Sequence, residues 1–127
     1  MTIKVALAGA GAFGIKHLDG IKNIADVEVV SLISRDLEKT REVADKYGIP
    51  HVTTDLADSL AIKEVDAVIL CTPTQMHADQ SIACLRAGKH VQVEIPLADS
   101  LKGAAEVVAL QKQTGLVAMC GHTRRFN

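Results

Sequence analysis

The stretch VALAGAGAFG, residues 5–14, decides the fold of this 127-residue chain. It joins an apolar run, Ile3–Ala8, to a glycine turn with GxGxxG spacing at Gly9, Gly11 and Gly14, and a helical pattern follows. In such a turn the first glycine permits a tight bend, the second lets a pyrophosphate approach the backbone, and the third permits close packing of helix and strand. The N–H groups and the dipole of the helix would then bind the phosphates. The alternative is a glycine-rich turn that binds no ligand.

Beyond the turn, apolar runs alternate with segments of helical period. This alternation predicts a doubly wound parallel sheet of the Rossmann type, an α/β fold with right-handed crossovers. The expected strands are Ile3–Ala8, Val27–Ser34, His51–Thr53, Ala67–Cys71, His90–Glu94 and Val117–Cys120. The expected later helices are Leu37–Tyr47, Leu56–Lys63, about Met76–Ala87 and about Ser100–Gln113. Asp36, Asp55 and Thr74 are the expected N-caps, and Gly48, Gly88 and Gly115 the expected helix ends.

The bulk composition limits the classes of function. The length supports one domain, and 14 basic against 15 acidic residues give a net charge of −1, so the charge gives no case for nucleic acid or a membrane surface. The longest apolar runs have strand length, and the N-terminus carries no export signal. The three cysteines show no metal-binding spacing. We therefore expect a cytoplasmic protein with reduced cysteines and no metal site.

The residues after the second strand bear on the choice of dinucleotide. An acid is expected near residue 34 if a ribose 2′-hydroxyl is to be bound, but the chain has Ser34 and Arg35 there, followed by Asp36. A hydroxyl and a guanidinium can both donate to a 2′-phosphate, which favours NADP(H), with NAD(H) or dual use still possible. Arg35 could instead be a solvated charge. Asp36 could be a displaced ribose acid, although a helix pattern starts directly after it.

Three further strand ends carry candidate site residues, because ligands of such sheets bind outside the carboxyl ends of the strands. CTPTQMH, residues 71–77, offers polar groups near the nicotinamide half, with His77 the local candidate for a contact near the reacting carbon. In VEIPL, residues 93–97, Glu94 could bind a ribose hydroxyl, and the bond before Pro96 could be cis. GHTRRFN, residues 121–127, could bind carboxylates through its arginines. The alternatives are a helix-face histidine, a solvent-exposed acid and an ordinary basic loop.

These motifs together resemble the glucose-fructose oxidoreductase and inositol dehydrogenase-like family of NAD(P)-dependent oxidoreductases. VALAGAGAFGIKHL and CTPTQMHADQSIACLRAGKHVQVEIPLADS carry the resemblance, which covers essentially the whole chain. The motifs, GHTRRFN especially, are similar to those of an NADP-dependent member from aromatic catabolism that oxidises a cyclic hemiacetal bearing carboxylates. The implied cofactor-binding residues are Gly9, Gly11, Ala12, Phe13, Gly14, Ser34, Arg35, Cys71, Thr72, Pro73, Thr74, His77, Glu94 and Arg125. The implied substrate-binding residues are Glu94, His122, Arg124 and Arg125.

The resemblance also implies what this chain lacks. Many family members have lysine between the acid and the proline of the fifth strand end, where this chain has Ile95, and isoleucine cannot move a proton. Family members carry a second α/β domain that supplies the substrate pocket, a catalytic histidine and the oligomer interface. We expect residues 1–121 to form the cofactor domain and residues 122–127 to begin the connection to that second domain. The chain alone is then expected to bind NADP(H) with little or no turnover, and the full-length form to be a homo-oligomer. The rivals are a sugar or cyclitol dehydrogenase and a non-catalytic NADP(H)-binding module.

Overall fold

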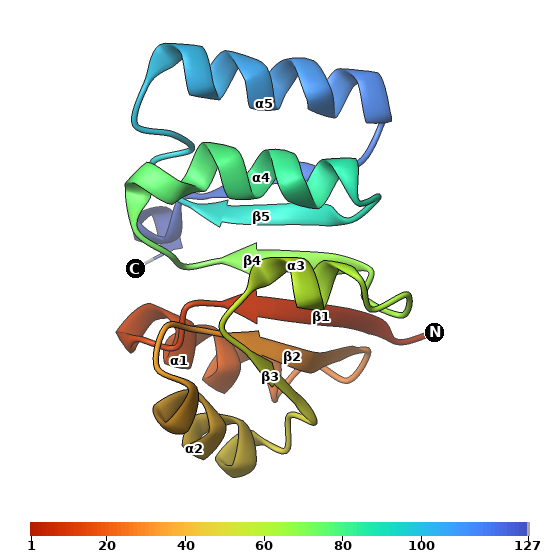
Figure 1. Ribbon diagram of the computed structural model, residues 1–127, viewed down its shortest axis with the longest axis vertical. Helices are drawn as coiled ribbons and strands as arrows, with labels where there is room; N and C mark the ends of the chain where they lie inside the picture. Colours follow the sequence, from red (N-terminus) through yellow and green to blue (C-terminus); the bar gives the residue numbers. More distant parts are fainter. Residues whose placement is uncertain (127) are drawn as a thin grey trace.

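The computed structural model describes residues 1–126, which form a parallel sheet with helices on both faces (Figure 1). The strands are β1 (Ile3–Ala8), β2 (Val27–Ile33), β3 (His51–Thr53), β4 (Ala67–Leu70), β5 (His90–Glu94) and β6 (Ala118–Gly121). Their spatial order is β3-β2-β1-β4-β5-β6, with every pair parallel. From β1 the strands are added outward on one side as β2 and β3, and then on the other side as β4, β5 and β6, so the switch point of the sheet lies between β1 and β4. The predicted doubly wound Rossmann fold is confirmed.

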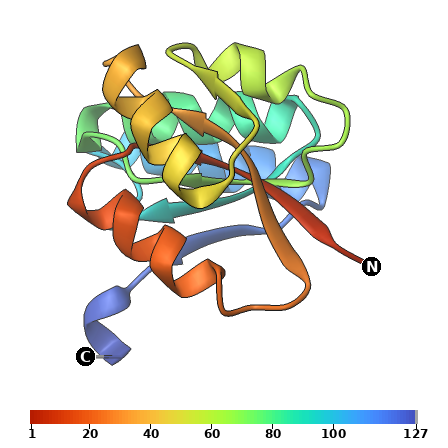
Figure 2. The ribbon, with the colours of Figure 1, turned by 90° about the horizontal axis from the view of Figure 1, so that it is seen from below.

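The helices are α1 (Ala12–Ile21), α2 (Leu37–Tyr47), α3 (Leu56–Leu60), α4 (His77–Arg86) and α5 (Leu101–Thr114), with 3₁₀ turns η1 (Thr74–Met76) and η2 (Thr123–Phe126). Helix α1 lies on one side of the sheet, and α3 and α4 lie on the other (Figure 2). Alternate residues of β1 enter two separate cores, because successive side chains of a strand point to opposite faces. Val5 and Leu7 pack with Leu18 of α1, whereas Ala6 and Ala8 pack with Leu85 of α4.

The helix ends follow the expected chemistry at most positions. The Asp36 carboxylate accepts a hydrogen bond from the Lys39 N–H at 3.2 Å, and Asp55 accepts one from Ala57 at 3.0 Å. Gly48 ends α2 with φ of 70°, in the left-handed region that favours glycine. The expected caps at these helix ends are confirmed.

Five expectations of detail are wrong. Strand β2 ends at Ile33 rather than Ser34, and β4 ends at Leu70 rather than Cys71. Strand β6 is displaced by one residue, and α3 ends at Leu60 rather than Lys63. Thr74 does not cap α4. The Pro73 backbone leads first into the 3₁₀ turn η1, and α4 starts only at His77. The extra turn moves the helix start three residues beyond the expected cap.

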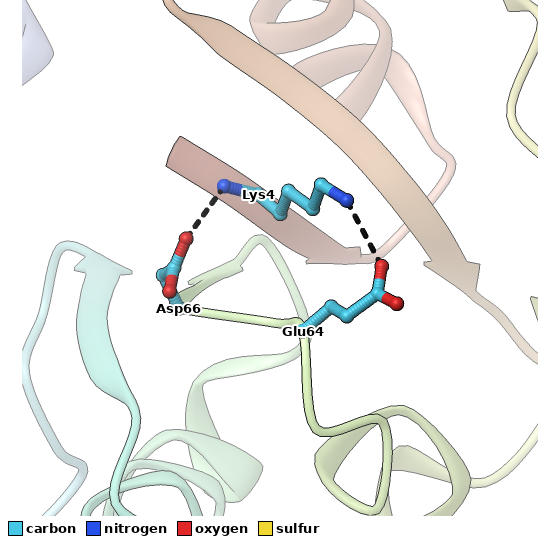
Figure 3. A network of polar contacts seen from close by, with 3 residues as sticks. All are labelled: Lys4, Glu64 and Asp66. Atoms are coloured by element: carbon cyan, nitrogen blue, oxygen red, sulfur yellow. Dashed lines mark hydrogen bonds and ion pairs between the residues drawn. The ribbon is translucent and has the colours of Figure 1, made fainter. Parts of the chain in front are cut away.

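Polar contacts join the amino-terminal end of β1 to the loop before β4, at the edge of the sheet away from the glycine turn (Figure 3). The Lys4 N–H donates to the Asp66 carboxylate at 2.9 Å, and its ammonium donates to Glu64 at 2.9 Å. The hydrogen bond with Glu64 raises the pKa of Lys4. These contacts are exposed and far along the strands from the glycine turn, so they belong to the scaffold.

Candidate cofactor site

The glycine turn after β1 is built as the sequence predicts, and its glycines have distinct roles. Gly9 has φ of 104°, and a Cβ there would overlap the carbonyl of Cys71. A Cβ on Gly14 would overlap the carbonyl of Gly9 and lie 3.8 Å from Leu7 of β1, so that glycine lets α1 start against the turn. Gly11, the N-cap of α1, has no described atom within 4 Å of such a Cβ. The turn therefore leaves open backbone at the positive end of α1, which suits a phosphate.

A cavity of about 440 Å³, the glycine-turn cavity, lies beside this turn. The exposed Arg35 lies at its border with the half-buried Ser34, at the end of β2. Asp36 also borders it, but its carboxylate already accepts the Lys39 N–H. The acid is thus engaged as a helix cap, and the guanidinium is the strongest donor on this side of the cavity. Of the expected cofactor residues, the cavity is lined by Gly9, Gly11, Ser34, Arg35, Cys71, Thr72 and Pro73.

A second cavity of about 310 Å³, the Glu94 cavity, lies at the carboxyl ends of β4 and β5. Cys71 and Thr72 line both cavities, so they adjoin. Of the expected residues, the Glu94 cavity is lined by Phe13, Cys71, Thr72, Thr74, His77, Glu94 and Arg124. Ala12 and Gly14 lie in the first turn of α1 and line neither cavity. His122 and Arg125 also line neither of the two, and the Arg125 N–H donates to the His122 carbonyl. Asn127 lies outside the described residues.

His77 has a different environment from the one expected. Its side chain is 1% exposed, and its Nδ1 and Nε2 lie 2.7 Å from the carbonyl oxygens of Pro96 and Thr72. A neutral imidazole donates to one of these oxygens, and an imidazolium donates to both. Neither nitrogen is free for a cofactor or for proton transfer. The expected polar contact of His77 near the reacting carbon is therefore not supported, and the ring instead joins the turns after β4 and β5.

Glu94 is 9% exposed, and its Oε1 lies 2.7 Å from Nε2 of His17 in α1. Gly121 pairs with Glu94 across β5 and β6, and a Cβ on Gly121 would lie 3.4 Å from the same oxygen. His17 was not among the residues expected from the sequence. Its only local signal is its place four residues after Phe13 on the helix that the glycine turn opens. The bond before Pro96 is cis, as the sequence allowed.

Cys71 completes a cluster with His17 and Glu94, whose donor atoms all lie within 4.8 Å of one another. Burial and then the charge of Glu94 raise the pKa of the Cys71 thiol to about 12. The thiol is therefore protonated at neutral pH, and the imidazole is bonded to the carboxylate. A soft cation would have to displace that proton and break that bond. As it stands, Cys71 and Glu94 line the Glu94 cavity, and His17 is hydrogen-bonded to Glu94.

Comparison with known proteins identifies the family. Residues 3–122 match the family described as "Oxidoreductase family, NAD-binding Rossmann fold". The chain belongs to this family. A 4-carboxy-2-hydroxymuconate-6-semialdehyde dehydrogenase of Sphingobium sp. (strain NBRC 103272 / SYK-6) is 66% identical over 98% of this chain and 40% of its own length. A scyllo-inositol 2-dehydrogenase (NADP(+)) of Bacillus subtilis (strain 168) is 30% identical over 92% of this chain and 36% of its own length.

Solved structures of the family agree with the fold. The scyllo-inositol dehydrogenase from Lactobacillus casei with bound cofactor NAD(H) and scyllo-inositol gives a TM-score of 0.93 at 26% identity, over 100% of this chain and 38% of that one. The chain thus spans about two fifths of the length of the relatives it matches. The helices of residues 1–126 include none that is long and apolar enough to cross a membrane.

Proposed function

We propose that this chain is the NADP(H)-binding domain of a dehydrogenase that oxidises the cyclic hemiacetal of 4-carboxy-2-hydroxymuconate-6-semialdehyde to 2-pyrone-4,6-dicarboxylate. The identity of 66% to the Sphingobium dehydrogenase supports this substrate class. The glycine turn supports the assignment of a dinucleotide, because a Cβ at Gly11 would stand in the space that a pyrophosphate needs. A cytoplasmic location and a homo-oligomeric full-length protein remain part of this proposal.

The preference for NADP(H) over NAD(H) depends on the end of β2. Arg35 is exposed and borders the glycine-turn cavity, whereas the Asp36 carboxylate caps α2. A 2′-phosphate there would gain a charge-assisted hydrogen bond from the guanidinium and a further donor from the Ser34 hydroxyl. Within residues 1–126 the Arg35 side chain has no hydrogen-bond or ion-pair partner, whereas the Asp36 carboxylate has one in the Lys39 N–H. This difference is the observation that carries the choice.

Hydride transfer converts the hemiacetal to a lactone. The hemiacetal carbon loses a hydride, its hydroxyl loses a proton to a base, and the carbon–oxygen bond becomes a carbonyl. When bound, NADP⁺ supplies the hydride acceptor. In this chain Glu94 would accept a hydrogen bond from a hydroxyl of the nicotinamide-side ribose, and Arg124 at the rim of the Glu94 cavity would pair with a substrate carboxylate. Phe13 and Ile95 would form apolar walls that limit water.

The test is a calorimetric titration with NADPH and NADH, repeated with Arg35→Ala. Loss of a charge-assisted hydrogen bond should weaken NADPH binding by roughly 1–3 kcal/mol and leave NADH binding nearly unchanged. Arg41→Ala is the matched control, because Arg41 is a nearby exposed arginine, in α2, that does not line the glycine-turn cavity. Equal losses for both cofactors would refute the assignment of Arg35 to the 2′-phosphate.

A second candidate is a cyclitol dehydrogenase, because the scyllo-inositol dehydrogenases named above share the family and the fold. Their substrate is a neutral polyol, for which Arg124 at the rim would have no carboxylate partner. A turnover screen of the full-length protein with NADP⁺, comparing the hemiacetal dicarboxylate with inositols, separates the two. Cofactor binding without turnover of either class would indicate a binding module instead.

A further inference from the structure

The contact between α1 and β5 joins two parts of the site that lie 77 residues apart in sequence, His17 and Glu94. We propose that His17 is a positioning residue, which holds the Glu94 carboxylate in place to bind the ribose on the nicotinamide side of the dinucleotide. The proposal deepens the function proposed above, since it requires a dinucleotide in the two cavities. It does not require that the dinucleotide carry a 2′-phosphate.

The surroundings of Glu94 make His17 its principal partner. Within residues 1–126, His17 is the one residue whose side chain is hydrogen-bonded to the Glu94 carboxylate, and their side chains are only 17% and 11% exposed. Cys71 lies nearby but is a neutral thiol, and Gly121 offers no side chain. Without His17, the nearly buried carboxylate would lose its side-chain hydrogen-bond donor within the described residues. An ionised carboxylate accepts about four hydrogen bonds, so the one from His17 leaves capacity for ribose hydroxyls.

The place of His17 on α1 links this carboxylate to the phosphate end of the same helix. His17 follows Gly11 by six residues, which is roughly 9 Å along a helix. Phe13, four residues before His17, lies on the same side of α1 and lines the Glu94 cavity. One rigid helix therefore presents open backbone to the pyrophosphate and a donor to Glu94. Because pyrophosphate and ribose are covalently joined, fixing both from one element sets the direction in which the nicotinamide enters the cavity.

A merely structural role is the competing explanation, since His17 also fastens α1 to the sheet. Two ligands that differ only in the second ribose separate the roles, 2′-phospho-ADP-ribose and 2′-phospho-ADP. We expect His17→Ala to weaken binding of 2′-phospho-ADP-ribose and NADPH about tenfold, the cost of one charge-assisted contact, and 2′-phospho-ADP by less than about twofold. His17→Gln, which keeps a donor at the Nε2 position, should recover most of the loss. Lys22→Ala, at the exposed end of the same helix, should change neither.

Titration calorimetry measures these affinities, with the unfolding midpoint of each variant recorded beside them. Equal loss for both ligands, no loss for either, or a failure of His17→Gln to recover binding would overturn the proposal. The same comparison with ADP-ribose and ADP distinguishes a failure of the NADP(H) assignment from a failure of the role proposed for His17. If only the 2′-phosphate ligands fail to bind the wild-type protein, the NADP(H) assignment falls, and the ribose-dependent loss with ADP-ribose still decides the role of His17. Failure of the wild-type protein to bind any of the four ligands would overturn both.

Discussion

Two alanine substitutions in the glycine turn should separate stability from binding, because Gly14→Ala should lower the stability and Gly11→Ala the dinucleotide affinity. Gly14→Ala places a Cβ in overlap with the Gly9 carbonyl, and Gly9 is itself confined against the Cys71 carbonyl. Because both obstacles are backbone, neither can rotate away, and we expect a cost of at least about 3 kcal/mol, at the upper end for overpacking. For a domain of this length that loss corresponds to a fall in unfolding midpoint of roughly 10–15 °C.

Gly11→Ala should leave the unliganded protein nearly as stable as wild type. The backbone at Gly11 has φ of −79°, which alanine adopts readily, and the added Cβ meets no described atom within 4 Å. Alanine is a poorer N-cap than glycine but lowers the entropy of the unfolded chain, so the net change should stay within about 1 kcal/mol. The same methyl group projects into the space proposed for the pyrophosphate, so dinucleotide affinity should fall roughly 5- to 150-fold.

Differential scanning calorimetry without ligand and titration calorimetry with NADPH and NADH test the pair. The expected pattern is a destabilised Gly14→Ala variant beside a stable Gly11→Ala variant that binds neither cofactor well. Wild-type affinity of Gly11→Ala would show that the pyrophosphate does not approach this backbone. An unchanged midpoint for Gly14→Ala would refute the packing argument for that glycine.

Two further predictions concern Asp36 and the two cysteines whose pKa is most raised. Asp36→Ala should lose about 1 kcal/mol of stability, because it removes the cap of α2. Asp36→Asn should keep the cap and leave the NADH affinity unchanged, as calorimetry can check. A selective loss of NADH binding in Asp36→Asn would instead indicate that Asp36 binds the ribose. Burial raises the pKa of both Cys71 and Cys84 to about 12, so their thiolates form only at high pH. Iodoacetamide should label these two cysteines slowly at pH 8, faster as the pH rises toward 11, and at the ordinary rate in urea. Peptide mass spectrometry measures the labelling. Rapid labelling of the folded protein at pH 8 would contradict the raised pKa of these thiols.

The sequence was most informative where the structure depends on residues close together along the chain. The glycine turn, the alternation of apolar runs and the cap at Asp36 are local patterns, and the structure confirms all three. The helix from about Met76 was predicted to within one residue, but its cap was not. Thr74 is a good cap by residue type, yet it lies in the 3₁₀ turn η1 that follows Pro73.

Contacts between distant segments were beyond local patterns. His17 reaches Glu94 because α1 crosses to the carboxyl end of β5, and no spacing in one sequence marks a pair 77 residues apart. His77 illustrates the reverse case, a polar residue at a promising strand end that burial assigns to the carbonyls of Thr72 and Pro96. In both cases the fold decides whether an imidazole faces ligand or backbone.

Ile95 stands where many family members have a lysine, so the other ionisable groups of the Glu94 cavity decide whether this chain can take up the hydroxyl proton. Within residues 1–126 the cavity is lined by a thiol with pKa about 12, an imidazole with both nitrogens engaged, a carboxylate bonded to His17, and an arginine. A hydroxyl proton needs a free base close to neutral pKa, and of these groups only Glu94 has free acceptor sites, which the ribose would occupy. The described residues are therefore suited to holding and orienting the dinucleotide, and we expect the proton acceptor of the proposed oxidation to come from a residue outside these two cavities.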